Sequence, residues 1–340
     1  MSDILTRKEG RAGRITFNRP AALNALSHEM SLSIEAALDE WRGDAEVDLV
    51  IIDAVGERAF CAGGDIAAVY HAGKAGQMDA GRDFWADEYR MNAKIAEYSK
   101  PIVAFMQGFV MGGGVGVGGH ASLRIVGEST QVAMPESGIG LIPDVGGTLL
   151  LARAKGRIGE YLGVTGARMS AGDAIFAGFA DAFLPEAEWE TTKAAMITTG
   201  RADLPATPAP ASDLQAAQGE IDACFQGDIH QIRAAVAGST SSLMASALKA
   251  IDRNSPLSMA VTLRLIAMTR AQNTIRAALE NEFRYTARSV EHSDFLEGVR
   301  AQIIDKDRAP TWRHTLITLP VEEVEAILAP LPAHITLNFA

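Results

Sequence analysis

Two acidic residues lie in an apolar, glycine-bearing segment at residues 134–147, MPESGIGLIPDVGG. Such surroundings remove water from Glu136 and Asp144, and the loss of hydration raises the pKa of a carboxyl group toward neutrality. A carboxyl group with that pKa can exchange protons under physiological conditions, and two of them permit a division of labour. The structural alternative is that Asp144 caps a helix beginning at Gly146 and that Glu136 pairs with an arginine such as Arg124.

A glycine run at residues 112–119, GGGVGVGG, follows a strand-like segment and is expected to open a short helix. The unpaired N–H groups of a helix N-terminus suit a phosphate or a developing oxyanion. The alternatives are close packing of a helix of small residues, or a dinucleotide loop. Gly114, Gly116 and Gly119 match the dinucleotide pattern G-x-G-x-x-G. However, Glu128 follows this run too closely to leave room for the usual crossover helix.

Two further segments carry weaker signals. At residues 59–65, AFCAGGD, a buried strand gives way to glycines that would let a ligand approach the backbone, although an ordinary tight turn has the same pattern. Cys61 has no histidine nearby in the sequence to activate it, which favours a small core residue over a nucleophile. Residues 87–90, DEYR, fall in the middle of an expected helix and are predicted to form a solvated face.

The elements that would position these residues alternate between strands and helices. A hairpin is expected at residues 3–18, and Ser27 is expected to cap a helix. Apolar runs predict further strands, and a helix is expected at about 82–98. These strands are expected at residues 49–52, 102–105 and 123–126. The alternation of strands and helices predicts an α/β core over residues 1–185.

The second part of the chain, residues 186–340, is predicted to be a linker and a helical region that completes the cover of the active site. The Pro/Ala-rich stretch 201–213 is the clearest boundary. An alanine-rich helical segment is expected at 231–251, followed by one long amphipathic stretch at 257–289.

Composition excludes several classes of protein. The net charge of −11 opposes nonspecific binding to nucleic acid, and no apolar run is long enough to cross a membrane. Two cysteines without suitable spacing predict neither a disulfide nor a metal site. The N-terminal residues fit neither a secretory signal nor a transit peptide, so a cytoplasmic protein is expected.

Four ordered motifs together resemble the crotonase (enoyl-CoA hydratase/isomerase) superfamily. They are NRP with LNAL at residues 18–26, AFCAGGD at 59–65, KPIVAFMQGFVMGGGVG at 100–116, and MPESGIGLIPDVGG at 134–147.

Within that superfamily the chain most resembles the 3-hydroxyisobutyryl-CoA hydrolase branch. One departure from the hydratase pattern supports this branch, because Gly116 stands where hydratases carry a second catalytic glutamate, whereas Asp144 adds a carboxylate. The other branch features are the GGGVG run, Glu88 in EYRMN, NSP at 254–256, DFLEGVR at 294–300 and IDKD at 304–307.

The resemblance implies a crotonase-like spiral of ββα repeats with an α-helical C-terminal region, and a substrate with a bent coenzyme A moiety. It also implies an oxyanion hole at Gly64 and Gly113. Stabilising a developing oxyanion is worth several kcal/mol in such sites. Glu136 would act as nucleophile or general base, and Asp144 would position water or the substrate hydroxyl. The remaining substrate contacts would be Glu88, Ala62 and Ile66.

The implied reaction is hydrolysis of a short 3-hydroxyacyl-CoA to free acid and coenzyme A, as in valine catabolism, with no cofactor beyond the substrate's own coenzyme A and no metal. The alternatives are a hydratase or isomerase acting on an unsaturated acyl-CoA and a noncatalytic acyl-CoA-binding protein. Many superfamily members form trimers or dimers of trimers. A homo-oligomer is therefore one expected assembly, unless the C-terminal helices cover the same surface.

Overall fold

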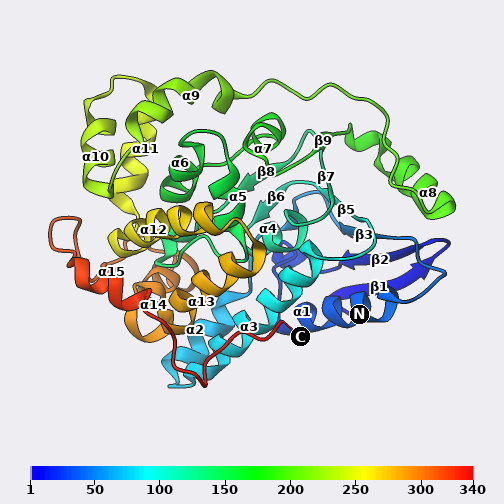
Figure 1. Ribbon diagram of the computed structural model, residues 1–340, viewed down its shortest axis with the longest axis horizontal. Helices are drawn as coiled ribbons and strands as arrows, with labels where there is room; N and C mark the ends of the chain where they lie inside the picture. Colours follow the sequence, from blue (N-terminus) through cyan, green and yellow to red (C-terminus); the bar gives the residue numbers. More distant parts are fainter. Residues whose placement is uncertain (1, 340) are drawn as a thin grey trace.

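A computed structural model describes residues 2–339 and shows an α/β protein in which the chain winds between two sheets (Figure 1). One sheet has six strands in the order β1-β2-β3-β5-β7-β9, and the other has three in the order β4-β6-β8. All neighbouring strands are parallel except β1 and β2, which form the predicted hairpin. The strands are β1 (Ile4–Glu9), β2 (Ala12–Phe17), β3 (Leu49–Ala54), β4 (Ala59–Cys61), β5 (Ile102–Met106), β6 (Phe109–Met111), β7 (Leu123–Val126), β8 (Gln131–Ala133) and β9 (Ala182–Phe183).

From β3 to β8, each turn of the chain gives one strand to each sheet and then enters a helix. Thus β3 and β4 precede α2, β5 and β6 precede α4, and β7 and β8 precede α5. This arrangement confirms the predicted spiral of ββα repeats. The central strand β5 is buried along its whole length, as expected for a parallel strand covered on both faces.

The helices fall into two groups along the chain. The first group is α1 (His28–Arg42), α2 (Ile66–Lys74), α3 (Met78–Ala96), α4 (Gly113–Gly118), α5 (Gly147–Arg153), α6 (Ile158–Thr165), α7 (Ala171–Ala177) and α8 (Trp189–Thr199), with 3-10 turns η1 (Pro20–Ala22), η2 (Glu136–Ile139) and η3 (Glu186–Glu188). The second group is α9 (Asp213–Cys224), α10 (Ile229–Gly238), α11 (Ser242–Arg253), α12 (Pro256–Gln272), α13 (Ile275–His292), α14 (Phe295–Val299), the π-helical turn η4 (Arg300–Ile304) and α15 (Val321–Ile327).

Some local predictions are confirmed and others need correction. The Ser27 side chain caps α1 by accepting from the Met30 N–H, as predicted. The helix expected at 82–98 begins earlier, at Met78. The long stretch expected at 257–289 is two helices, because Asn273 adopts a left-handed conformation with φ of 51° and Thr274 caps the next helix.

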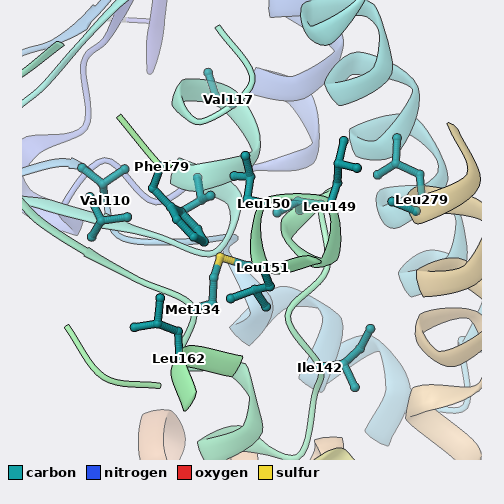
Figure 2. Close-up of a cluster of buried hydrophobic side chains, with 14 of the residues drawn as sticks. Val110, Val117, Met134, Ile142, Leu149, Leu150, Leu151, Leu162, Phe179 and Leu279 are labelled. Atoms are coloured by element: carbon teal, nitrogen blue, oxygen red, sulfur yellow. The ribbon is translucent and has the colours of Figure 1, made fainter. Parts of the chain in front are cut away.

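The C-terminal helices share the main apolar core with the spiral. Helix α13 packs on α3, and α12 packs on α5 and α6. Residues 200–212 between the two groups form no helix or strand, as predicted for the linker, which runs along one edge of the molecule from α8 to α9 in Figure 1. The division into domains at residue 185 stays a prediction. Figure 2 shows the core around α5, including Val110, Val117, Met134, Ile142, Leu149, Leu150, Leu151, Leu162, Phe179 and Leu279.

None of the helices within residues 2–339 combines the length and the apolarity needed to cross a lipid bilayer.

Candidate active site

A cavity of about 500 Å³ opens between the spiral and the C-terminal helices. Its walls include Arg253, Gln302 and Ile303 from the C-terminal region, so that region does help to enclose the cavity. All of the site residues predicted from the sequence lie on its lining: Ala62, Gly64, Ile66, Glu88, Gly113, Glu136 and Asp144.

Two glycine N–H groups lie side by side in this wall. Gly64 follows β4, and its loop is held by the Leu26 N–H donating to the Gly63 carbonyl and the Asp65 N–H donating to the Leu26 carbonyl. Gly113 begins α4, and a Cβ built on it would lie only 3.3 Å from the Gly64 nitrogen. Neither N–H group has a hydrogen-bond acceptor within residues 2–339. Both glycines line the cavity, so their backbones are accessible to a ligand there.

The Glu136 carboxyl group lines the same cavity and forms no ion pair within residues 2–339. Only 5% of the residue is exposed, and its Oε2 has no hydrogen-bond partner among the described residues. A Cβ on Gly112 would lie 2.7 Å from its Oε1, so glycine is required for this approach. Burial, together with the charges of Asp144, Glu282 and Glu88, raises the pKa of Glu136 well above its ordinary value. The alternative of a pair with Arg124 is wrong, because Arg124 binds Asp181 at 2.6 Å.

The Asp144 side chain is 4% exposed and accepts a hydrogen bond of 2.7 Å from the Tyr89 hydroxyl. Burial raises its pKa to about 7, although the bond from Tyr89 opposes that rise. Asp144 does not cap α5, so the structural alternative is wrong for this residue too. The Gly147 N–H, the first of the helix, donates to the Asp144 backbone carbonyl, whereas the N–H groups of the N-cap Gly146 and of Thr148 donate to Glu282, at 2.8 and 3.0 Å.

The prediction of a solvated face at residues 87–90 is wrong for its two central residues. Tyr89 is fully buried and its hydroxyl lies 3.3 Å from Thr286 of α13, whereas Glu88, only 2% exposed, has its Oε1 2.8 Å from where a Cβ on Gly113 would lie. Burial and the charge of Asp144 raise the pKa of Glu88 well above its ordinary value, and its Oε1 has no partner among the described residues. Asp87 forms a hydrogen bond of 2.6 Å with His28, and Arg90 forms an ion pair with the buried Glu35 at 2.7 Å.

Gly116 has no room for a side chain. A Cβ there would lie 2.8 Å from both the Asn92 Nδ2 and the Val145 Cβ. The position that would carry the second glutamate of a hydratase is thus filled by neighbouring residues.

The glycine run also serves close packing, the simpler alternative. A Cβ on Gly114 would lie 2.2 Å from the Cys61 carbonyl oxygen, so α4 rests directly on β4. Cys61 is a buried core residue, as predicted, and burial raises the pKa of its thiol to about 12. The dinucleotide alternative is wrong, because β7 follows α4 at once and Glu128 accepts from the Glu186 N–H near the surface.

Three residues that contact Asp144 or the backbone that follows it were not identified from the sequence: Tyr89, His120 and Glu282. The sequence could have indicated Glu282, because its helical spacing from Leu279 and Thr286 places this acid on the buried face of α13. His120 had none, because its contact with the Val145 carbonyl depends on tertiary structure.

Comparison with known proteins agrees with this geometry. A family model described as enoyl-CoA hydratase/isomerase matches residues 12–328. The zebrafish (Danio rerio) mitochondrial 3-hydroxyisobutyryl-CoA hydrolase is 38% identical over 92% of this chain and 85% of its own length. The human (Homo sapiens) enzyme of the same name is 36% identical over 92% of this chain and 84% of its own length.

Two solved structures are similar over nearly the whole chain. One, described as an enoyl-CoA hydratase from Rhodobacter sphaeroides, is 55% identical, with a TM-score of 0.97 over 99% of this chain and 100% of its own. Another, described as a carnitinyl-CoA dehydratase from Mycobacterium thermoresistibile, is 40% identical, with a TM-score of 0.93 over 100% of this chain and 99% of its own. These matches confirm the resemblance found in the motifs: the chain belongs to the enoyl-CoA hydratase/isomerase family.

Proposed function

We propose that this protein hydrolyses a short 3-hydroxyacyl-CoA thioester to the free acid and coenzyme A. One observation carries the proposal: the buried carboxyl groups of Glu136 and Asp144 share a cavity with the unpaired N–H groups of Gly64 and Gly113. The names of the zebrafish and human relatives support the same reaction.

In this proposal the thioester oxygen accepts hydrogen bonds from Gly64 and Gly113. Attack on the carbonyl carbon places negative charge on that oxygen, and the two N–H groups stabilise it without having to reorient. Glu136 acts in one of two ways. As a general base it takes a proton from water, the resulting hydroxide attacks the carbon, the C–S bond breaks, and the proton passes to the departing sulfur. As a nucleophile its carboxylate forms an anhydride with loss of the thiolate, and water then cleaves the anhydride.

Asp144 and Glu88 would bind and orient rather than bond to the carbon. Asp144, with a pKa of about 7, can accept a hydrogen bond from water or from the substrate hydroxyl when ionised. Burial and the charge of Asp144 raise the pKa of Glu88, which favours its protonated form, and a protonated carboxyl group can both donate to and accept from a hydroxyl group. Ala62 and Ile66 would contact the substrate beside the oxyanion hole.

We further propose 3-hydroxyisobutyryl as the acyl group, which would place the protein in valine catabolism, with the cytoplasm as its compartment. The acyl group is the finer part of this proposal, since one methylene more or less in a pocket changes binding by only about 1–3 kcal/mol.

A second candidate, addition of water to an unsaturated acyl-CoA, is favoured by the description of the Rhodobacter sphaeroides structure. The crowding at Gly116 argues against it, because hydratases hold the added water between two glutamates, and of those two positions only that of Glu136 carries a glutamate here.

One pair of assays separates these functions. Thiol release from 3-hydroxyisobutyryl-CoA, followed with a thiol reagent, is expected to exceed hydration of crotonyl-CoA, followed by loss of the enoyl absorbance. Hydration without thiol release would overturn the proposal in favour of a hydratase. Tight coenzyme A binding with no turnover on a panel of short acyl-CoAs would indicate a noncatalytic binding protein.

A further inference from the structure

The peptide group that joins Val145 to Gly146 is held at both of its ends. Its carbonyl oxygen, on Val145, lies 2.8 Å from the His120 Nε2. Its N–H, on Gly146, donates to the Glu282 Oε2 at 2.8 Å. The two partners come from distant parts of the chain, one after α4 and the other in α13. A single peptide group is therefore fixed in orientation by two independent elements.

The backbone on the Val145 side of this peptide group has an unfavourable conformation, whereas the Gly146 side has a positive φ that glycine adopts readily. Val145 has a φ of 54° and Gly146 a φ of 77°. A positive φ is uncommon for any residue other than glycine and is a pronounced exception for a β-branched one such as valine. Strained backbone of this kind persists only where the surrounding structure enforces it, and it is concentrated at functional sites. The residue directly before the strained Val145 is Asp144.

Glu282 accepts the hydrogen bonds that a side chain of the N-cap residue would otherwise accept at the start of α5. The N-cap residue of α5 is Gly146, which has no side chain to accept from the first turn. Glu282 is fully buried, and its two oxygens accept from the Gly146 N–H, the Thr148 N–H and the Thr148 hydroxyl. Burial raises the pKa of Glu282 to about 8, and the bonds from Thr148 and Gly146 oppose that rise. One turn further along α13, Thr286 lies 3.3 Å from the Tyr89 hydroxyl that binds Asp144.

His120 completes the arrangement as a neutral donor. Burial lowers its pKa to about 4, so the ring carries one N–H near neutral pH. Only the tautomer with the proton on Nε2 can donate to the Val145 carbonyl.

We propose that Glu282 and His120 are positioning residues, which hold the Val145–Gly146 peptide group in its strained conformation and thereby aim the Asp144 carboxylate into the cavity. Their effect on turnover rests on the proposed function, whereas their effect on the loop does not. Neither residue lines the cavity. They act on the reaction only through the backbone that follows Asp144.

The test combines kinetics with hydrogen exchange in the full-length protein. Glu282→Gln keeps the size of the side chain but turns one acceptor into a donor that faces an N–H group, and His120→Ala removes the donor at the other end. Each substitution is expected to speed amide exchange in residues 144–150. Each should also lower kcat for thioester hydrolysis by about 10- to 100-fold with little change in KM, because small displacements of a catalytic group have effects of this order.

Matched controls separate positioning from general loss of stability. Glu280→Gln makes the same chemical change on an exposed residue of α13 and should alter neither readout. Ser241→Ala removes the N-cap of α11, far from the loop, and should lower the melting temperature without changing kcat. Because His120 and Glu282 hold one peptide group, their combined effect on kcat is expected to be smaller than the product of the single effects.

The outcomes distinguish this inference from the proposed function. A folded Glu282→Gln or His120→Ala protein with wild-type exchange and wild-type kcat would overturn the positioning role, as would an equal loss of kcat in Ser241→Ala. If the wild-type protein released no thiol, the proposed function would fail, and the exchange measurement would still decide whether the two residues hold the loop. If Glu282→Gln does not fold, amide exchange and kcat can be measured instead in His120→Ala and in Thr148→Val, which removes the hydroxyl bonded to Glu282. Wild-type values of both quantities in these variants would overturn the positioning role.

Discussion

The Tyr89 hydroxyl donates a hydrogen bond of 2.7 Å to the Asp144 Oδ2, and both side chains are buried. A phenol proton stabilises a carboxylate more than a carboxylic acid, so this bond opposes the effect of burial. The pKa of Asp144, about 7, reflects the balance of the two. Tyr89 thus helps to set the pH range in which Asp144 is ionised.

Replacing Tyr89 with phenylalanine should move that range upward. A hydrogen bond to a charged group contributes about 1.5–3 kcal/mol, and one pKa unit corresponds to about 1.4 kcal/mol, so a shift of about one unit or more is expected. The measurement is the acid limb of the pH profile of kcat/KM. Tyr98→Phe, which removes a hydroxyl bonded to the Leu38 carbonyl away from the cavity, is the control and should leave the limb in place. An unchanged limb in Tyr89→Phe would show that Asp144 is not the group that titrates there.

Glu136→Gln and Asp144→Asn should each reduce kcat strongly while the protein stays folded. Each substitution keeps the shape of the side chain and removes its ability to take a proton, which contributes about 10²- to 10⁴-fold in positioned acid–base catalysis. Steady-state kinetics of thiol release measures the loss. Glu128→Gln, a change of the same kind near the surface, should have no effect. Near wild-type turnover in either active-site variant would remove that residue from the chemistry.

The cluster of buried carboxyl groups should make the protein less stable as the pH rises. In the folded state the pKa of Asp144 is about 7, above the value of about 3.9 in an unfolded chain, so between these values the folded state binds more protons. Its stabilising contribution is complete below about pH 4 and is lost as the pH rises through about 7. Glu136 and Glu282, whose pKa values are also raised, act in the same direction.

Asp144→Asn should therefore weaken the pH dependence of the free energy of unfolding. The ionisation of Asp144 accounts for a difference of about 3 kcal/mol between pH 5 and pH 8, because only the folded state holds this proton over the two pH units from 5 to about 7, at about 1.4 kcal/mol each. Urea denaturation at the two pH values measures this difference. Parallel pH dependences in the wild-type protein and the variant would contradict the prediction.

A side chain at position 116 should lower the stability of the protein and should not give it hydratase activity. Because a Cβ there would lie 2.8 Å from the Val145 Cβ, Gly116→Ala is expected to destabilise by about 1–3 kcal/mol, as overpacked cores do. Thioesterase activity should fall with it, since Val145 follows Asp144. Gly116→Glu should fold worse and should not gain hydration of crotonyl-CoA. Gly43→Ala, at a position with no atom within 4 Å, is the control. A stable Gly116→Glu variant with hydratase activity would show that the pocket can accept the second glutamate.

The elements that the sequence predicted well are those whose signal is local. Strand β7 was predicted at its observed bounds because its four residues form one apolar-rich run, and the Ser27 cap depends only on the residues that follow it. Gly64, Gly113, Glu136 and Asp144 were placed in one cavity because ordered motifs carry them.

The supports of the site were missed because they depend on contacts between distant segments. Glu88 and Tyr89 resemble residues of a solvated helix face until α13 is packed on α3. The bond from the Gly146 N–H to Glu282 joins residues separated by most of the C-terminal half of the chain. No local pattern near Asp144 indicates which distant acid will accept from that N–H.

The position of Glu282 beyond the linker also affects how the gene tolerates premature termination. Every residue to which we assign chemistry precedes residue 145, yet the acid that caps α5 belongs to α13. A nonsense or frameshift lesion anywhere between codons 200 and 280 would leave all of those residues encoded, but would leave the Gly146 and Thr148 N–H groups without their acceptor. Such alleles should behave as complete losses of function, and a nascent chain on the ribosome should become active only after α13 has emerged.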